Sequence, residues 1–500
     1  MRVSLVYPLL SNERSRIDEN KQFWPPLGLA YIAAVLIQNN HEVQIIDRDL
    51  IFRKNQLSFN ITNKMTIEKI LSFDSEMVGF SATTPNISDV KLLSAIIKKQ
   101  NSDIFTVLGG PHVTGEPGLT LKTCPDIDIA VRGEGEETML ELADKKSLEK
   151  VLGITYRVSL EKILSNEDRP LIENIDNIPL PARSILDMQF YTRPSRFTSR
   201  NLSLRTTHIF TARGCPYCCH YCAGPLMGRR KVRFHSPLYV LKEVKELIDV
   251  YHVEAIYFAE DMFLSDKKRA VELLKLFIEN GINKKIAWMA QLRSKVVDTE
   301  LLALMKKAGC VHVEYGFESG SQRILNLMNK KSTIDDNIRA AMLTRKGGLR
   351  FQGNFIVGYP GEKEEDFTDT IKFIKRIKPT HISVNMFMPL PGTYIYNKLK
   401  EDNRLLPGWD NIGNQDTPQY NYADMSPSKF EELYLKARLT VIIPLNLLHF
   451  TLDNLSNPVR FFYIVSTQSL GMLIKVWHAI KRLARLKITK ISQIFLVQKI

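Results

Sequence analysis

The sequence predicts an α/β protein with a doubly wound parallel sheet, then a partial (β/α)6 barrel, and then a mostly helical C-terminal region. Short apolar runs of strand length alternate with helical patterns in residues 1–150, and the same alternation resumes in residues 204–400. A length of 500 residues is enough for about three domains. We therefore expect one domain at residues 1–150, a connector at 151–203, a second domain at 204–400 and a C-terminal cap at 401–500.

The first domain is predicted from five apolar runs and one helical pattern. The runs lie at residues 3–7, 43–46, 77–81, 105–108 and 129–131. The helical pattern at residues 27–39 follows two prolines, which suit the start of a helix. A flavodoxin-like sheet of this kind binds ligands outside the carboxyl ends of its strands. The residues expected to bind a ligand there are Ser81, Thr83, Gly109, Gly110, His112, Gly133 and Glu134.

Prolines and a low glycine content predict that residues 151–203 form an extended, ordered connector. In residues 204–400, six apolar runs are expected to be the strands of the partial barrel. The runs lie at residues 207–211, 255–258, 286–290, 311–316, 351–357 and 381–386. Functional groups in such barrels gather where the strands end. The candidate residues at these strand ends are Glu260, Asp261, Arg293, Glu318 and Gly358.

Four of the six cysteines fall in the ten residues 213–222, which read RGCPYCCHYC. The other two, Cys124 and Cys310, are isolated. Because the first residues are too short an apolar run for a signal peptide, this clustering indicates a metal site in a reducing compartment rather than disulfides. A tetrahedral zinc site needs four ligands, and no second Cys-x2-Cys follows. Zinc is therefore the less favoured alternative.

Cys215, Cys219 and Cys222 are spaced as Cys-x3-Cys-x2-Cys, with an aromatic residue, Tyr221, before the last cysteine. Three thiolates on a four-iron cluster leave one iron without a protein ligand, which is what a catalytic centre needs. Cys218 has no upstream cysteine at the distance that a shifted register would require, so we interpret it as a spare thiol. The pattern resembles the signature of the radical S-adenosylmethionine (SAM) superfamily.

This resemblance implies a [4Fe-4S] cluster on the three spaced cysteines, with SAM bound to the open iron. Reductive cleavage of SAM would then give a 5′-deoxyadenosyl radical, with electrons from a reductant protein such as flavodoxin or ferredoxin. The implied SAM contacts are Glu260 and Asp261 for the amino group, Arg293 for the carboxylate, Glu318 for the ribose, and Gly358 and Tyr221 for the adenine.

Residues 109–112, GGPH, and residues 132–136, RGEGE, resemble segments of the cobalamin-binding domain that precedes many radical SAM cores. The resemblance implies that the ligand-binding residues named for the first domain bind cobalamin. No histidine precedes His41, so the loop after the first strand cannot supply the lower axial histidine of the mutase-type domains. His112 is a candidate for that role, with a pocket-shaping loop residue as the plainer interpretation. A flavodoxin-like fold without a ligand is the alternative for the whole domain.

We therefore expect an enzyme, a cobalamin-dependent radical SAM protein that transfers a methyl group to an unactivated carbon. As the resemblance implies, the radical takes a hydrogen atom from a small-molecule or lipid-like substrate, and methylcobalamin delivers the methyl group. The first alternative is a radical cyclase or oxidase resembling the anaerobic porphyrin-ring cyclases. The alternative from another class is a non-catalytic iron–sulfur or corrinoid carrier or sensor, which would have no need of SAM contacts at four strand ends.

The net charge of +14 is concentrated toward the C-terminus, where residues 441–500 hold eight Lys or Arg and one acid. Two uncharged runs, at residues 439–452 and 461–474, are shorter than the roughly 20 residues that span a bilayer. The basic, apolar-faced segment at 475–490 suits either an anionic membrane surface or a helix packed on the barrel. We expect a cytoplasmic protein, with peripheral membrane contact through residues 439–500 as one of these two alternatives. No nucleic acid partner is expected, because no RNA-binding domain follows the core.

Overall fold

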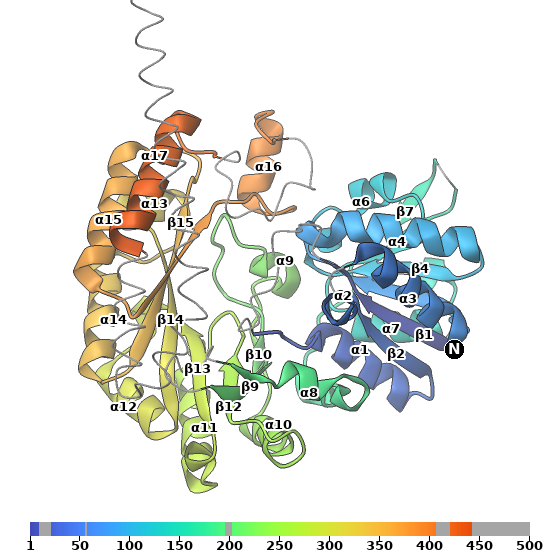
Figure 1. The fold of residues 1–500 in the computed structure, drawn as a ribbon, viewed down its shortest axis with the longest axis horizontal. Coiled ribbons are helices and arrows are strands. Elements are labelled where there is room, and N and C mark those ends of the chain that lie inside the picture. Colours follow the sequence, from blue (N-terminus) through green and yellow to red (C-terminus); the bar gives the residue numbers. More distant parts are fainter. Residues whose placement is uncertain (10–21, 56–57, 160, 196–202, 407–420, 443–500) are drawn as a thin grey trace, which may run out of the picture. The chain divides into compact units, whose positions relative to one another are not determined.

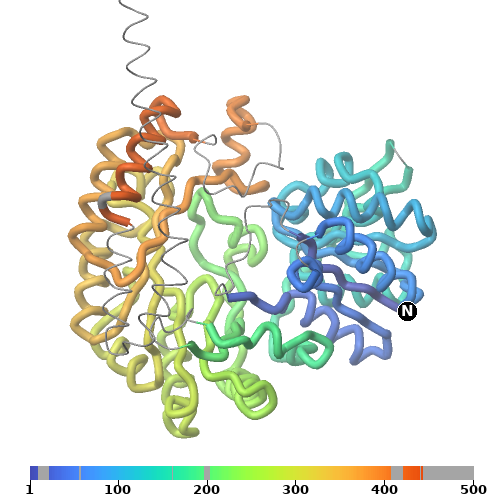
Figure 2. Tube along the Cα trace, viewed as in Figure 1, coloured from blue at the N-terminus to red at the C-terminus, as the bar shows by residue number. Residues whose placement is uncertain are grey.

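The computed structural model describes residues 1–9, 22–55, 58–159, 161–195, 203–406 and 421–442, which Figure 1 and Figure 2 draw in sequence colours. The chain falls into two compact units. Unit 1 comprises Met1–Ser195, Leu204–Ile286 and Met388–Asn414, and unit 2 comprises Arg196–Ser203, Ala287–Phe387 and Gln415–Ile500. The uncharged run at 461–474 and the basic segment at 475–490 lie outside the described residues. Across the described ranges, no helix has both the length and the apolar character to cross a membrane.

A seven-stranded sheet forms the centre of the first part of unit 1, in the order β2-β1-β3-β4-β5-β6-β7. Its strands are β1 (Arg2–Tyr7), β2 (Glu42–Asp47), β3 (Met77–Ser81), β4 (Phe105–Gly109), β5 (Ile129–Val131), β6 (Ile154–Arg157) and β7 (Ile163–Ser165). The first five strands pair in parallel, with Val3 opposite Val43 on one side and Met77 on the other. This is the predicted doubly wound, flavodoxin-like order. The last two strands pair antiparallel and extend the sheet into the predicted connector.

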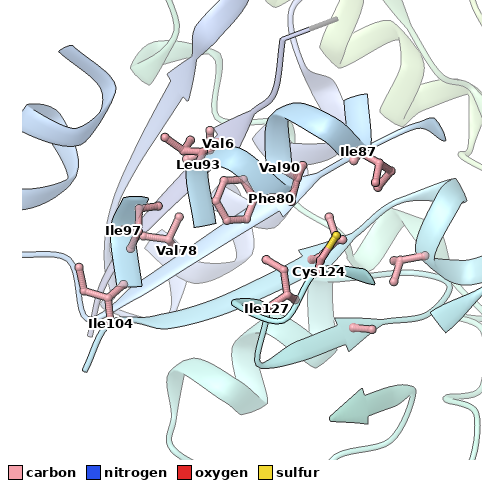
Figure 3. Packing of buried hydrophobic residues seen from close by; sticks show 14 of the residues in the cluster. Val6, Val78, Phe80, Ile87, Val90, Leu93, Ile97, Ile104, Cys124 and Ile127 are labelled. Atoms are coloured by element: carbon pink, nitrogen blue, oxygen red, sulfur yellow. The ribbon is translucent and has the colours of Figure 1, made fainter. Parts of the chain in front are cut away.

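Helices cover both faces of this sheet. They are α1 (Leu27–Gln38), α2 (Arg48–Lys54), α3 (Phe59–Ser72), α4 (Ile87–Gln100), α5 (Pro111–Gly115), α6 (Pro117–Thr123) and α7 (Glu136–Ala143). On one face, Leu29 of α1 and Met139 of α7 share a core with Val3. On the other face, Leu93 of α4 packs in a second core with Phe80 (Figure 3). Strands buried on both faces read as continuous apolar runs, which is why the sequence pattern identifies them.

The described part of the connector that follows this sheet, residues 166–195, is partly buried. Ile175 packs against Tyr31 of α1. Arg183 is fully buried, and its guanidinium lies 2.5 Å from the carboxylate of Glu243 on α10 (Pro237–Asp249). Since a buried charge without a partner is strongly unfavourable, this pair fixes the connector to α10. The short helix α8 (Met188–Tyr191) ends the segment.

The second part of unit 1 begins the predicted barrel. β8 (Pro194–Ser195) pairs antiparallel with β9 (Leu204–Ile209), and β9 pairs in parallel with β12 (Ala255–Phe258). The antiparallel strands β10 (Ala212–Arg213) and β11 (Arg233–Phe234) close a hairpin that contains the cysteine loop and α9 (Gly224–Gly228). The helices α11 (Lys267–Glu279) and α16 (Tyr394–Glu401) also belong to this unit.

Unit 2 contains four parallel strands, each paired with the next. They are β13 (Ala287–Leu292), β14 (Cys310–Glu318), β15 (Arg350–Val357) and β16 (His381–Met386). The helices are α12 (Thr299–Lys307), α13 (Gln322–Leu327), α14 (Ile334–Lys346), α15 (Glu364–Ile377) and α17 (Pro427–Ala437), with a π-helical turn at Arg438–Ile442. Phe317, Phe355 and Phe373 form an aromatic core. Counted with β9 and β12, these strands give the chain the six βα repeats predicted for the partial barrel.

Candidate functional site

A cavity of about 540 Å³ lies within unit 1. Its walls come from the carboxyl ends of β3, β4 and β5, from α1, from the β10–β11 hairpin and from the end of β12. This volume is in the range of small-molecule and cofactor pockets. The predicted site residues that the structure brings together in this cavity are Ser81, Gly109, Gly110, Gly133, Glu134, Glu260 and Asp261.

Glycines leave part of the cavity wall flat. A Cβ atom added at Gly28 of α1, or at Gly133, would meet no other atom within 4 Å, so both positions open into free space. At Gly79, an added Cβ would lie 3.1 Å from side-chain atoms of Leu5 and Met139, which complete an apolar surface. A surface of this kind fits the face of a large, flat ligand such as a corrin macrocycle.

His112 and Thr83 are predicted ligand-binding residues that are not among the described residues lining this cavity. His112 is buried at the start of α5, with Nδ1 3.0 Å from Oγ1 of Thr84. Burial lowers the pKa of His112 to about 4, so the imidazole is neutral near pH 7. The hydroxyl of Thr83 donates to Asn86 at 2.6 Å in the turn before α4. In this structure both residues shape the loops around the cavity.

Glu260 and Asp261 follow β12 and form one wall of the cavity. Glu260 is buried and accepts hydrogen bonds from the backbone N–H (3.2 Å) and the hydroxyl (2.7 Å) of Thr211. Burial raises the pKa of Glu260 in spite of these hydrogen bonds. Asp261 faces the open cavity, and desolvation by the surrounding protein raises its pKa as well. An ammonium group in the cavity would offset the cost of holding these two carboxylates ionised.

Close backbone contacts hold the cysteine loop. Gly214 has a φ of 92°, and a Cβ added there would collide with the carbonyl oxygen of Lys231. The N–H of Cys222 donates to the carbonyl oxygen of Cys219 at 3.1 Å, and the N–H of Gly224 donates to Sγ of Cys222 at 3.3 Å. The three predicted cysteine ligands and Tyr221 are half-buried in this loop, so they are shielded from solvent without being enclosed.

The three spaced cysteines also interact electrostatically. The pKa of Cys222 is raised to about 12, chiefly by burial, and the charges of Asp261, Cys219 and Cys215 contribute to this rise. Cys219 and Cys215 are the two partners of Cys222 in the predicted spacing. Within the described ranges, no three His, Cys, Asp or Glu side chains lie close enough to hold a single metal ion.

Four charged side chains join the cysteine loop to the segment after β5. Arg213 donates to Glu134 (2.9 Å) and to Glu136 (2.6 Å), and Arg233 donates to the other carboxylate oxygen of Glu134 (2.7 Å). All four residues line the cavity. Burial acts to raise the pKa of Glu134, but the two arginines outweigh it and lower the pKa. Glu134, predicted as a cobalamin contact, is therefore also an anchor of the cysteine loop.

Sequence reasoning assigned no role to several residues of this site: Gly28, Gly79, Arg213 and Arg233. A glycine in the first turn of a predicted helix was a usable signal for Gly28, because glycine disfavours helices unless space is needed. The two arginines border the cysteine loop in sequence, which was a second signal. Their partners lie 77 to 99 residues away, and no local pattern identifies such pairs.

Arg293 and Glu318, two predicted SAM contacts, lie in unit 2 at the ends of β13 and β14. Arg293 is buried and precedes a short 3₁₀ turn. Glu318 has a φ of 63°, and its carboxylate accepts a hydrogen bond from Nζ of Lys330 at 2.7 Å. A left-handed backbone at a buried residue other than glycine is strained, and such strain is concentrated at functional sites. A ribose hydroxyl at Glu318 would have to share the carboxylate with Lys330.

Gly358 follows β15 with a φ of 80°, which favours glycine. Its N–H donates to Glu362 at 2.5 Å, and its carbonyl oxygen accepts from the N–H of Tyr422 at 3.2 Å. A Cβ added at Gly358 would lie 3.3 Å from the ring of Phe430 on α17, so the expected free space on this side is filled. The adenine contact at this turn stays a prediction. Glu362, which sequence reasoning missed, is fully buried, and burial raises its pKa to about 8.

Two family models match the chain. Residues 209–374 match the model of the radical SAM superfamily, and residues 14–143 match the model of the B12 binding domain. An uncharacterized methyltransferase from Pyrococcus horikoshii is 34% identical over 410 residues, which cover 81% of this chain and 84% of that protein. An anaerobic magnesium-protoporphyrin IX monomethyl ester cyclase from Rubrivivax gelatinosus is 30% identical over 411 residues, which cover 80% of this chain and 70% of that protein.

A solved structure has a similar fold. The radical S-adenosylmethionine methyltransferase TsrM from Kitasatospora setae, solved with cobalamin and a [4Fe-4S] cluster bound, superposes with a TM-score of 0.66 at 17% identity. The match covers 80% of this chain and 78% of that structure. At this identity the likeness concerns the fold, and it confirms the predicted order of a doubly wound sheet followed by a partial barrel.

Proposed function

We propose that this chain, which belongs to the cobalamin-binding radical SAM family of enzymes, transfers a methyl group to an unactivated carbon of a small-molecule substrate. In such enzymes SAM and a [4Fe-4S] cluster supply the radical that activates the carbon, and cobalamin supplies the methyl group. One observation supports this function above all. In a single cavity of unit 1, the glycine-lined strand ends meet the acidic pair Glu260 and Asp261 and the residues that flank the cysteine ligands.

In this proposal each side of the cavity has its own task. Cys215, Cys219 and Cys222 bind the cluster, and the acidic pair receives the amino group of SAM. The strand ends at Ser81, Gly109, Gly110, Gly133 and Glu134 bind the corrin ring, for which the glycines leave a flat wall. The protein thereby holds the reacting groups together and limits the access of water to the radical.

Three residues of unit 2 are further proposed SAM contacts. Arg293 pairs with the SAM carboxylate, because a guanidinium binds a carboxylate in a bidentate manner. Glu318 accepts from the ribose and shares its charge with Lys330. The turn at Gly358 and the ring of Tyr221 border the adenine. Thr83 and His112 stay proposed cobalamin-binding residues, and their hydrogen bonds to Asn86 and Thr84 support the loops beside the cavity.

A radical cyclase or oxidase is the second candidate function. The cyclase from Rubrivivax gelatinosus is 30% identical and shares the same extent of chain as the methyltransferase relative. Both reactions begin with the same SAM-derived radical and differ in whether cobalamin delivers a carbon. A corrin-binding wall serves either chemistry, so the products of the reaction separate the two functions.

The partners proposed for the enzyme follow from this chemistry. Radical SAM enzymes act on a small-molecule substrate and take electrons from an external reductant. We propose that the reductant is a flavodoxin or ferredoxin, that the substrate is lipid-like, and that the protein works in the cytoplasm with its basic C-terminal segment at a membrane surface. The excess of basic residues in residues 441–500 supports the last point, because such segments bind anionic lipids.

Product analysis tests the function. The protein is reconstituted anaerobically with iron, sulfide and methylcobalamin, then given SAM and titanium(III) citrate, and 5′-deoxyadenosine and S-adenosylhomocysteine are measured by mass spectrometry. Methyl transfer predicts that both products form and that S-adenosylhomocysteine depends on added cobalamin. Deoxyadenosine alone would favour the cyclase or oxidase, and the absence of both products would contradict either function.

A further inference from the structure

The cysteine loop is contacted by the start of α16, which is labelled in Figure 1. The backbone N–H of Ile395 donates to the carbonyl oxygen of His220 at 3.1 Å. The ring of Tyr394 stacks on the imidazole of His220, with 4.0 Å between the ring centroids and 28° between the planes. His220 lies between Cys219 and Cys222 in the sequence. The stacked rings of Tyr394 and His220 therefore connect α16 to the segment that contains the predicted cluster ligands.

Tyr394 is 59% exposed, although it is held in place on one side by His220. Several large apolar side chains of the described residues are exposed, and among these Tyr394 is the one with an aromatic ring. Tyrosine is one of the residue types that contribute most to binding at protein interfaces, because a rigid ring buries a large area at little cost in entropy. A fixed, exposed ring next to a redox centre is therefore suited to contact a partner protein.

The turn before α16 makes this surface rigid. The hydroxyl of Thr393 caps the helix by accepting from the N–H of Tyr396 (3.3 Å), and it donates to the carbonyl oxygen of Leu390 (2.7 Å). A Cβ added at Gly392 would lie 3.0 Å from Leu226 of α9, so the turn packs closely on the cysteine hairpin. Tyr394 thus keeps its position relative to the cysteine loop when a partner binds.

The charges near Tyr394 suit an acidic partner. Lys398 lies one helical turn after Tyr394 and pairs with Asp402 at 3.1 Å, where the two side chains are 52% and 38% exposed. Such exposed pairs contribute little, so Lys398 is available to exchange Asp402 for an acid of another protein. The net charge of the chain, +14, attracts acidic proteins at long range.

We propose that Tyr394, stacked on His220, is the docking and electron-entry point for a small, acidic one-electron carrier protein. This inference rests on the proposed function, since only a cluster that must be reduced from outside needs such a partner. In each docking event the carrier is oxidised by one electron and the cluster is reduced by one. A small inorganic reductant does not need the docking surface, because it diffuses to the cluster directly.

The test compares reduced flavodoxin with titanium(III) citrate as electron donors to the reconstituted full-length enzyme. The variants are Tyr394→Ala, Tyr394→Phe, and Leu238→Ala as a control for an exposed apolar residue of α10, which is 69% exposed. The affinity for oxidised flavodoxin is measured by fluorescence titration at several salt concentrations, and deoxyadenosine is measured with each donor. The affinity is a readout that does not depend on turnover.

We expect Tyr394→Ala to weaken flavodoxin binding by at least about tenfold and to lower flavodoxin-driven deoxyadenosine formation in parallel. Titanium-driven formation should stay within about twofold of the wild type, and Tyr394→Phe and Leu238→Ala should bind normally. Unchanged flavodoxin affinity in Tyr394→Ala, equal losses with both donors, or no flavodoxin binding by the wild type would each overturn the docking proposal. Loss of deoxyadenosine from the wild type with titanium(III) citrate would instead overturn the proposed function, while the affinities would still decide the docking surface.

Discussion

Replacing Arg213 by Met should loosen the hairpin that contains the cysteine loop. Arg213 forms charge-assisted hydrogen bonds with Glu134 (2.9 Å) and Glu136 (2.6 Å), and the three side chains are 18%, 11% and 7% exposed. Methionine keeps much of the length of the side chain but removes the guanidinium. Glu134 retains Arg233, whereas Glu136 loses the hydrogen bond that fixes its carboxylate in a nearly dry environment.

The size of the effect follows from this burial. Removing one partner of a buried ion pair costs about 3–5 kcal/mol, because it leaves an uncompensated buried charge. At about 1.4 kcal/mol for each factor of ten, local opening of the hairpin should become at least about a hundredfold more frequent. Arg213→Lys should have an intermediate effect, because an ammonium group lacks the planar fork that reaches both carboxylates.

Hydrogen–deuterium exchange of peptides from residues 211–235 measures this opening directly. Arg229→Met is the matched control, because Arg229 belongs to the same hairpin but pairs with Asp168 at 3.2 Å in an exposed position, where a pair contributes about 0–1 kcal/mol. The reasoning would be refuted if Arg213→Met exchanged no faster than Arg229→Met. Iron content after reconstitution gives a second readout and should fall in Arg213→Met only.

Three further predictions concern separate parts of the site. Gly28→Leu should weaken cobalamin binding at least about tenfold by isothermal titration, since its side chain would enter the cavity, while Gly28→Ala should keep most of the affinity and stabilise α1 by about 0.5 kcal/mol. Cys219→Ala should abolish the absorption of the reconstituted cluster, whereas Cys218→Ala should retain it; the opposite result would assign the other register. Because folded Glu362 keeps its proton up to about pH 8 while the unfolded chain loses it near 4.5, stability should fall by up to about 1.4 kcal/mol per pH unit between these values. Denaturation of Glu362→Gln across this range should lack that fall, and an identical pH profile in both proteins would contradict the assignment.

The fold was largely predictable because its strands are buried on both faces. Such strands read as continuous apolar runs, and β12 and β16 begin and end at the predicted residues. The β6–β7 hairpin was not predicted, since its strands are four and three residues long and the second is largely exposed. A short, half-polar strand has neither the length nor the alternation that marks a strand in sequence.

The site was predictable where function is concentrated in one short segment. The cysteine spacing and the glycines at strand ends each follow from local chemistry, and the cavity contains Gly109, Gly133 and Glu134 as expected. Local sequence patterns could not predict the partners of Arg213 or the position of His112. They depend on which residues distant in sequence become neighbours, and on whether a loop side chain turns toward the cavity or into the core.

The buried pair of Arg183 and Glu243 has a consequence for how the enzyme can be divided. A protease needs an exposed, locally unfolded segment, and the connector around Ile175 and Arg183 is buried against α1 and α10. Limited digestion should therefore not cut the connector between Ile175 and Arg183. For the same reason, a recombinant fragment that ends near residue 150 would lose part of its sheet and leave Tyr31 without Ile175 and Ile178. We therefore expect this region to be expressed and digested as one piece, although its sequence matches two family models.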